Sequence, residues 1–197
     1  MTTALHANQR RLVIMVKQPV AGRVKTRLAR DFGLSAAIGF YRHTLNRVTT
    51  RLAMDGRWRT VLSIAPKPAL AARSLPPHVP RVAQSEGNLG DRMQAIFEMR
   101  APGPVIVIGT DIPEVRPAHI AAAFKALGSN DLVFGPATDG GFWLVGMHRS
   151  PRVLDAFRNV RWSTPDALAD CIAGLAGHRV ARVATLRDVD DFDDLIQ

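Results

Sequence analysis

A basic segment between residues 17 and 28 is the first place where the sequence could do chemistry. It reads Lys-Gln-Pro-Val-Ala-Gly-Arg-Val-Lys-Thr-Arg-Leu, and its cations are Lys17, Arg23, Lys25 and Arg27. Cations this close together can neutralise a polyphosphate, and Gly22 lets the backbone approach a ligand. Val24 stands where a P-loop needs glycine, so the segment is not a P-loop. We expect a phosphate-binding turn; a solvated basic loop is the alternative.

The segment Glu86–Arg92 is a second candidate for anion binding. It opens an expected helix, whose backbone N–H groups could contact an anion together with Arg92. The predicted nucleotide- and phosphate-binding residues are therefore Lys17, Pro19, Gly22, Arg23, Lys25, Thr26, Arg27, Gly90 and Arg92.

Aspartates at two places are candidate metal ligands. Asp111 closely follows the apolar run Val105–Gly109, and a carboxylate after a buried strand, beside a polyphosphate, can hold Mg²⁺ or Mn²⁺. Asp188 and Asp190 lie two residues apart in the acidic segment 188–197, on one face of an extended chain. We expect a divalent cation at these three residues. Alternatively, Asp111 caps a turn. Beyond Asp190, Asp191 could cap a short final helix with Asp193 and Asp194 in its first turn.

A glycine-rich segment supplies the remaining candidates. Its predicted substrate-binding residues are Gly135, Asp139, Gly140, Gly141 and Phe142. The Gly-Gly pair allows an unusual backbone path near a ligand, and Phe142 or Trp143 could stack on a base or sugar, although core packing is the more ordinary role of both. Asp139 would be the general base if the acceptor is a sugar hydroxyl; an anionic acceptor needs none.

These segments must be positioned by alternating strands and helices. Apolar runs predict strands over 11–16, 60–65, 82–84, 105–109, 131–134, 142–146 and 180–186. Helical spacing predicts helices over 35–54 with Ser35 as N-cap, 89–99, 117–127, and from a cap at Ser163 or Thr164 to 175. Such alternation favours an α/β sheet with right-handed crossovers. Because sites gather at the carboxyl ends of strands, segments 17–28, 110–113 and 135–141 should converge.

Composition narrows the class of protein. Apolar residues make up 47% and charged residues 22%, and 197 residues suit one domain over 1–197. Cys171 is the only cysteine, which excludes an internal disulfide and a cysteine-rich zinc site, and we expect it to be a buried hydrophobe. The apolar runs are too short to span a bilayer and residues 1–11 lack a secretory pattern, so we expect a cytoplasmic location.

Charge leaves two rival classes open. Residues 1–60 hold twelve Lys and Arg against two acids, and the net charge is +9. A basic nucleic-acid-binding protein would fit this charge, but an aromatic-basic recognition motif is missing. The other rival is a catalytically silent domain that binds a nucleotide or a protein partner.

Four motifs occur in a fixed order: Lys17-x-Pro19-x-x-Gly22-x-Val24-Lys25-Thr26-Arg27-Leu28, Gly87-x-Leu89-Gly90-x-Arg92-Met93, Gly109-x-Asp111-x-Pro113 and Gly135-Pro136-Ala137-x-Asp139-Gly140-Gly141. Together they resemble a bacterial family of glycosyltransferases in the GT-A, nucleotide-diphospho-sugar transferase superfamily, one branch of which is linked to arsenosugar biosynthesis. The family is similar to the 2-phospho-L-lactate and molybdenum-cofactor guanylyltransferases. The resemblance spans about residues 11–195.

The resemblance implies a three-layer, Rossmann-like, mostly parallel sheet with helices on both faces, a nucleotide over the first loop, and a divalent cation on Asp111, Asp188 and Asp190. Phe142 departs from the family, which usually has tyrosine there. We expect a metal-dependent transferase with Lys25, Asp111 and Asp139 as catalytic residues. A glycosyltransferase acting on a nucleotide-diphospho-sugar is the leading reading. The alternative is a guanylyltransferase-like nucleotidyltransferase acting on a nucleoside triphosphate and a small phosphorylated or carboxylated acceptor.

Overall fold

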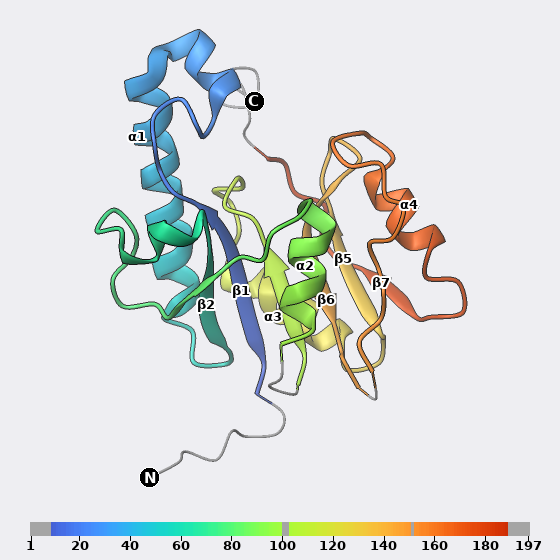
Figure 1. Cartoon of the computed structure of the whole chain (residues 1–197). Helices are drawn as coiled ribbons and strands as arrows, with labels where there is room; N and C mark the ends of the chain where they lie inside the picture. Colours follow the sequence, from blue (N-terminus) through green and yellow to red (C-terminus); the bar gives the residue numbers. More distant parts are fainter. Residues whose placement is uncertain (1–8, 100–102, 151, 189–197) are drawn as a thin grey trace.

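The computed structural model describes residues 9–99, 103–150 and 152–188 (Figure 1). Its elements in chain order are β1 (Arg11–Lys17), α1 (Thr26–Ala53), β2 (Arg59–Ala65), the 3₁₀ helix η1 (Lys67–Ala71), β3 (Arg81–Ala83), α2 (Leu89–Phe97), β4 (Val105–Ile108), α3 (Pro117–Ala126), β5 (Leu132–Pro136), β6 (Phe142–Met147), α4 (Ala167–Ala173) and β7 (Val180–Arg182). None of the helices in these ranges is long and apolar enough to cross a membrane.

The strands form one seven-stranded sheet in the order β3-β2-β1-β4-β6-β5-β7. Strand β6 runs antiparallel to β4 and β5, whereas the other neighbouring pairs are parallel. The carboxyl ends of every strand except β6 therefore lie along one edge of the sheet, which we call the carboxyl edge. The predicted mostly parallel α/β sheet is confirmed.

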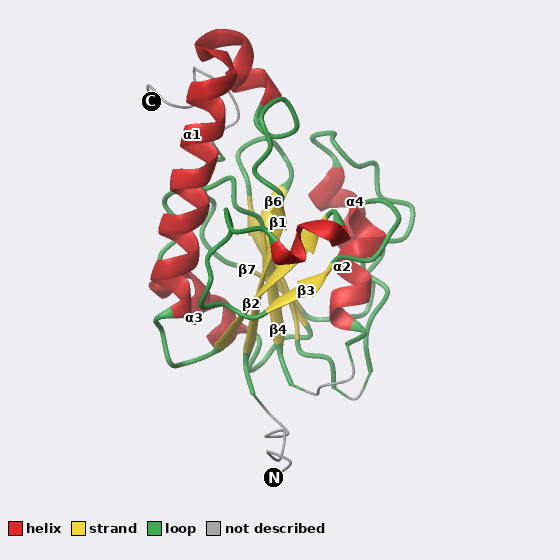
Figure 2. Cartoon of the chain, turned by 60° about the vertical axis from the view of Figure 1, so that its left-hand side comes forward, coloured by secondary structure: helices red, strands yellow, loops and turns green. Residues whose placement is uncertain are grey.

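The central strands are buried on both faces because helices cover each side of the sheet. Leu12, Ile14 and Val16 of β1 pack on the side of α1 and α3, and Val13 between them packs on the side of α2 and α4. Figure 2 shows the sheet between these two pairs of helices. Burying each such aliphatic side chain contributes roughly 1.5–3 kcal/mol. This alternation produces the predicted three layers and holds the carboxyl edge in place.

Helix α1 begins earlier than the sequence predicts. The prediction places its start at Ser35, but the helix runs from Thr26, with Gly33 in a non-helical conformation at φ 82° and ψ 162°. A positive φ of this kind favours glycine, so Gly33 divides the helix into a short first limb and a long second limb. Leu28 is the one buried residue of the first limb, which is too little apolar periodicity to reveal a helix.

The last helix and strand are shorter than predicted. Helix α4 has Asp166 as its N-cap, and the Asp166 N–H donates a hydrogen bond to the hydroxyl of Thr164, two residues earlier, at 3.3 Å. Strand β7 ends at Arg182, although Leu186 still pairs with Ala137 beyond β5 in a single bridge. Cys171 is fully buried in α4, as predicted, and burial raises the pKa of its thiol to about 12.

Candidate functional site

A pocket of about 720 Å³ opens at the carboxyl edge over β1, β2 and β3. We call it the cationic pocket, because its wall contains Lys17, Arg23, Lys67 and Arg92. The wall is built from the ends of three parallel strands and the start of α2. Small-molecule pockets commonly enclose roughly 300–1,000 Å³, so this one has room for a nucleotide.

The cations of the pocket come from separate parts of the chain. Lys17 is the last residue of β1, and Lys67 begins the 3₁₀ helix after β2. Arg92 is held in place because its Nε donates to the Gly87 carbonyl at 2.9 Å. Among the residues that the structure describes, the only carboxylate in the wall is that of Glu86. Four cations against one carboxylate make the pocket suited to a phosphate-bearing anion.

The sheet fixes the side-chain amide of Gln84 in the same wall. Its Nε2 donates to the Ser63 carbonyl at 2.8 Å and to the Val16 carbonyl at 3.4 Å. Only the amino end of an amide can donate to a carbonyl, so these two contacts set the orientation of the amide. The Gln84 Oε1 is therefore the acceptor end of an amide whose orientation is fixed.

Lys25 and Asp111 form an ion pair beside this pocket. The Lys25 Nζ lies 2.6 Å from the Asp111 Oδ1, and the side chains are 4% and 50% exposed, respectively. Lys25 has φ 48° and ψ 48°, a left-handed conformation that costs a non-glycine residue roughly 1–2 kcal/mol. The sequence predicts that Lys25 binds phosphate, whereas in the structure its ammonium lies on the carboxylate of Asp111.

The other residues of the predicted phosphate-binding set lie outside the pocket wall. Thr26 and Arg27 form the first turn of α1, which contains no acidic residue, and both are exposed. Pro19 is buried, and Gly22 provides the turn with φ 76°. Gly90 is a packing residue, because a Cβ there would lie 2.7 Å from the Trp162 ring. Sequence reasoning missed Lys67 and Gln84, since each lies outside the four motifs.

The Gly135–Phe142 segment begins inside β5 and ends at the first residue of β6, so the turn over 137–141 lies at the carboxyl edge. A Cβ on Gly135 would lie 2.5 Å from the Trp143 ring, so this glycine is needed for packing. The Asp139 Oδ1 accepts a hydrogen bond from the Gly141 N–H at 2.8 Å, and the carboxylate is exposed. Phe142 packs edge-on against Phe134, at a centroid distance of 5.2 Å. Phe142 thus belongs to an aromatic cluster of the core.

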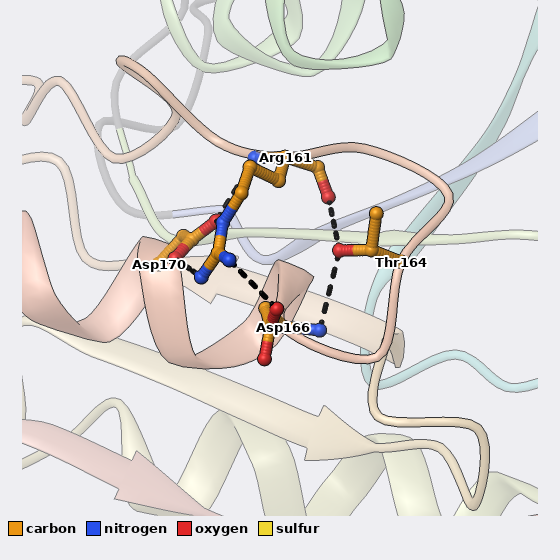
Figure 3. A network of polar contacts seen from close by, with 4 residues as sticks. All are labelled: Arg161, Thr164, Asp166 and Asp170. Atoms are coloured by element: carbon orange, nitrogen blue, oxygen red, sulfur yellow. Dashed lines mark hydrogen bonds and ion pairs between the residues drawn. The ribbon is translucent and has the colours of Figure 1, made fainter.

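A network of polar contacts supports this segment from the side of α4 (Figure 3). The Arg161 guanidinium contacts Asp170 at 2.8 and 2.9 Å and Asp166 at 2.8 Å. The loop that it braces carries Pro165, whose carbonyl oxygen would lie 2.2 Å from a Cβ on Gly140. Gly140 also has φ 88°, so both its conformation and its neighbour require glycine. The network therefore sets the backbone path next to Asp139.

The predicted metal ligands are only partly described. Asp188 follows Leu186, whose N–H donates to the Pro136 carbonyl at 3.1 Å, so Asp188 also lies near the carboxyl edge. Asp190 lies outside the described residues. Within the described ranges, no three His, Cys, Asp or Glu side chains gather into a group that could hold a metal ion. The basic turn and segment 110–113 do converge, because the Lys25 ammonium contacts the Asp111 carboxylate.

The comparisons with known proteins agree with this architecture. A family model described as "Uncharacterized protein conserved in bacteria (DUF2064)" matches residues 45–164, more than half of the chain. A Desulfovibrio desulfuricans G20 protein described as a "putative nucleotide-diphospho-sugar transferase" is 27% identical, with a TM-score of 0.88, over 95% of this chain and 85% of that chain. The predicted transferase-type fold is confirmed by this likeness. No protein of curated function matches the sequence.

Two more distant structures share the fold. Rv0371C of Mycobacterium tuberculosis H37Rv, in a complex with manganese, is 17% identical with a TM-score of 0.57, over 96% of both chains. A CMP:2-keto-3-deoxy-manno-octonic acid synthetase in a complex with CTP is 12% identical with a TM-score of 0.58, over 93% of this chain and 94% of that chain.

Proposed function

The chain belongs to the DUF2064 family of bacterial proteins, and we propose that it is a divalent-metal-dependent transferase whose donor is a nucleotide-diphospho-sugar. One observation carries the proposal: a single basic segment serves both the cationic pocket and the carboxylate of Asp111. Lys17 and Arg23 line the pocket, and Lys25 reaches Asp111 at 2.6 Å. A donor with its nucleoside in the pocket would thus have its diphosphate directed toward Asp111.

The residues at Asp111 fit a metal ion. Carboxylate oxygens are the ligands that Mg²⁺ and Mn²⁺ prefer, and the Asp111 carboxylate already contacts one cation, the Lys25 ammonium, while half of its side chain stays exposed. Asp188 and Asp190 would supply the further oxygens. A bound divalent cation would neutralise charge that develops on the phosphates as the nucleoside diphosphate leaves.

The side chains of the pocket would do the rest of the binding. Lys17, Arg23, Lys67 and Arg92 would offset the phosphate charge. The fixed acceptor of Gln84 would take a hydrogen bond from the nucleoside. If the sugar is transferred to a hydroxyl group, Asp139 would take the proton of that hydroxyl. The Asp139 carboxylate is exposed at the same edge of the sheet.

A second activity is favoured by the charge of the pocket. Four cations in one wall match a nucleoside triphosphate better than a nucleotide-sugar, which carries fewer phosphate charges. A nucleotidyltransferase would transfer the nucleotide to a small phosphorylated or carboxylated acceptor and release pyrophosphate. Such an acceptor is already an anion, and this version of the reaction therefore needs no general base.

A thermal-shift screen tests the proposal. Nucleotide-sugars and the four nucleoside triphosphates are each added with Mn²⁺ or with EDTA, because ligands that bind the native state raise its melting temperature. We expect stabilisation by one ligand that depends on Mn²⁺. Stabilisation by a nucleotide-sugar, without pyrophosphate release from any triphosphate, supports glycosyl transfer. Pyrophosphate release from a triphosphate in the presence of a small phosphorylated or carboxylated acceptor supports nucleotidyl transfer. The absence of stabilisation by any ligand contradicts both.

A further inference from the structure

Strand β1 extends beyond the end of its neighbour β4. Pairing with β2 continues to Lys17, whereas pairing with β4 stops at Ile14. Alternate residues of β1 face the two neighbours: the Arg11 N–H donates to Pro104 on the β4 side, and the Gln18 N–H donates to Ala65 on the β2 side. Lys17 lies an even number of residues after Arg11, so its backbone N–H and carbonyl also point to the β4 side. Strand β4 has already ended at this level and offers no partner for them.

The hydroxyl of Tyr41 makes the hydrogen bonds to Lys17 that a longer β4 would otherwise make. It donates to the Lys17 carbonyl at 3.0 Å and accepts from the Lys17 N–H at 3.2 Å. The Thr110 hydroxyl donates to the Tyr41 hydroxyl oxygen at 3.4 Å. A phenol has one donor and two acceptor sites, so these three contacts use its full capacity. The ring is 4% exposed, within the core between α1 and the sheet.

Tyr41 therefore joins the two halves of the candidate site. Lys17 belongs to the wall of the cationic pocket, and Thr110 directly precedes Asp111. The hydroxyl lies where β1 and β4 part, at the crevice in which α/β sheets commonly bind ligands. Burial raises the pKa of Tyr41 above its ordinary value, so the hydroxyl keeps the proton that it donates to Lys17.

We propose that Tyr41 is a positioning residue that sets the separation between the phosphate-binding end of β1 and the metal-binding Asp111. This role rests on the proposed function. If it is correct, the hydroxyl matters most when nucleotide and metal are bound together, because only then must both strand ends hold one ligand assembly. Removing the hydroxyl should reduce the increase in nucleotide affinity that Mn²⁺ causes. It should have a smaller effect on the free energy of unfolding.

The test is the affinity of Tyr41→Phe for the nucleotide-sugar or nucleoside triphosphate that stabilises the wild-type protein most in the thermal-shift screen. The affinity is measured by calorimetry with Mn²⁺ and with EDTA. Coupling between two bound ligands is typically about 5- to 150-fold, and we expect Tyr41→Phe to lower the gain from Mn²⁺ by about threefold or more. Thr49→Val is the matched control. It removes a buried hydroxyl from the same helix, and this hydroxyl has no hydrogen-bond partner among the described residues.

The outcomes separate this proposal from the proposed function. Positioning by the hydroxyl is supported if Mn²⁺ raises nucleotide affinity less in Tyr41→Phe than in the wild-type protein and equally in Thr49→Val and the wild-type protein. An unchanged gain in Tyr41→Phe, or an equal loss in the control, overturns the role of Tyr41 and leaves the function standing. A wild-type protein that binds neither a nucleotide-sugar nor a nucleoside triphosphate in a Mn²⁺-dependent way overturns both. If Tyr41→Phe does not fold, Thr110→Val decides: a reduced gain supports the role, and an unchanged gain overturns it.

Discussion

The Lys25 Nζ lies 2.6 Å from the Asp111 Oδ1, so the carboxylate proposed to hold a metal ion already contacts a cation of its own chain. A divalent cation and the ammonium would compete for this carboxylate. Phosphate groups of a donor would attract Lys25 away from Asp111, which would let the metal bind. By linkage, the metal would then strengthen the binding of the donor to the same extent.

Lys25→Met tests this competition. The change removes the charge and keeps most of the volume, so Mn²⁺ without nucleotide should bind about tenfold more tightly, equivalent to about 1.4 kcal/mol. Nucleotide should bind more weakly, because its phosphates lose a cation. Calorimetric titrations of Mn²⁺ into the two proteins measure the difference. Lys125→Met, at an exposed lysine on α3, is the control; unchanged Mn²⁺ affinity in Lys25→Met would show that no competition exists.

Asp111→Asn should separate binding from stability. We expect the variant to fold and to lose the Mn²⁺-dependent part of nucleotide binding. Its free energy of unfolding should be lower by about 1–3 kcal/mol, because the buried Lys25 ammonium loses this charged partner. Urea denaturation and nucleotide titrations measure the two effects.

Asp155→Asn is a matched control for that change. Asp155 is 51% exposed and pairs with Arg158 at 2.9 Å, but both partners face solvent. Exposed pairs contribute about 0.2–1 kcal/mol, so Asp155→Asn should change stability little and ligand binding not at all. Full metal-dependent binding by Asp111→Asn would refute the role of Asp111 as a metal ligand.

Lys67→Met tests the boundary of the cationic pocket. Lys67 lies beyond the basic segment, yet its side chain lines the same wall as Lys17. We expect the affinity for the donor to fall about tenfold, as for the loss of one charge-assisted contact of about 1.4 kcal/mol. The loss should shrink as salt is raised, since ions screen exposed charges. Equal affinity in low salt would place the phosphates elsewhere.

Acid should loosen the loop that supports Gly140. The Arg161 side chain, mainly by hydrogen bonding, lowers the pKa of Asp170 from 3.8 to about 2. A carboxylate with a depressed pKa in the folded state stabilises the fold above its ordinary pKa, and this contribution is lost as the pH falls toward 2. The melting temperature of the wild-type protein should therefore decline more steeply between pH 4 and pH 2 than that of Asp170→Asn. Parallel curves would show that the pair contributes nothing.

The sheet and its carboxyl edge were predictable because the central strands are runs of mostly apolar residues with burial on both faces. Val105–Ile108 is the clearest example, fully apolar and fully buried. The first limb of α1 was not predictable, since Leu28 alone marks its buried side and Gly33 interrupts the helix. Local sequence pattern thus specified the elements that face the core and missed the one that lies mostly in solvent.

The site was predictable only where a residue lies in a recognisable motif. Lys17, Arg23 and Arg92 were found in this way and do line one pocket. The orientation of Gln84 depends on carbonyls of β1 and β2, and the position of Tyr41 depends on β4 ending early. Both are consequences of strand pairing between distant parts of the chain, which the sequence pattern does not reveal. The partner of Lys25 was likewise set by tertiary structure, through the left-handed conformation that precedes α1.

The central claim is that the cationic pocket and Asp111 form one site for a nucleotide donor and a divalent cation. A titration of Mn²⁺ followed by the electron paramagnetic resonance signal of the free ion tests it most directly, with wild-type and Asp111→Asn protein, each with and without the donor found in the thermal-shift screen. We predict that the donor increases the Mn²⁺ affinity of the wild-type protein and has no such effect on Asp111→Asn. Equal Mn²⁺ binding by both proteins in the presence of the donor would contradict the claim.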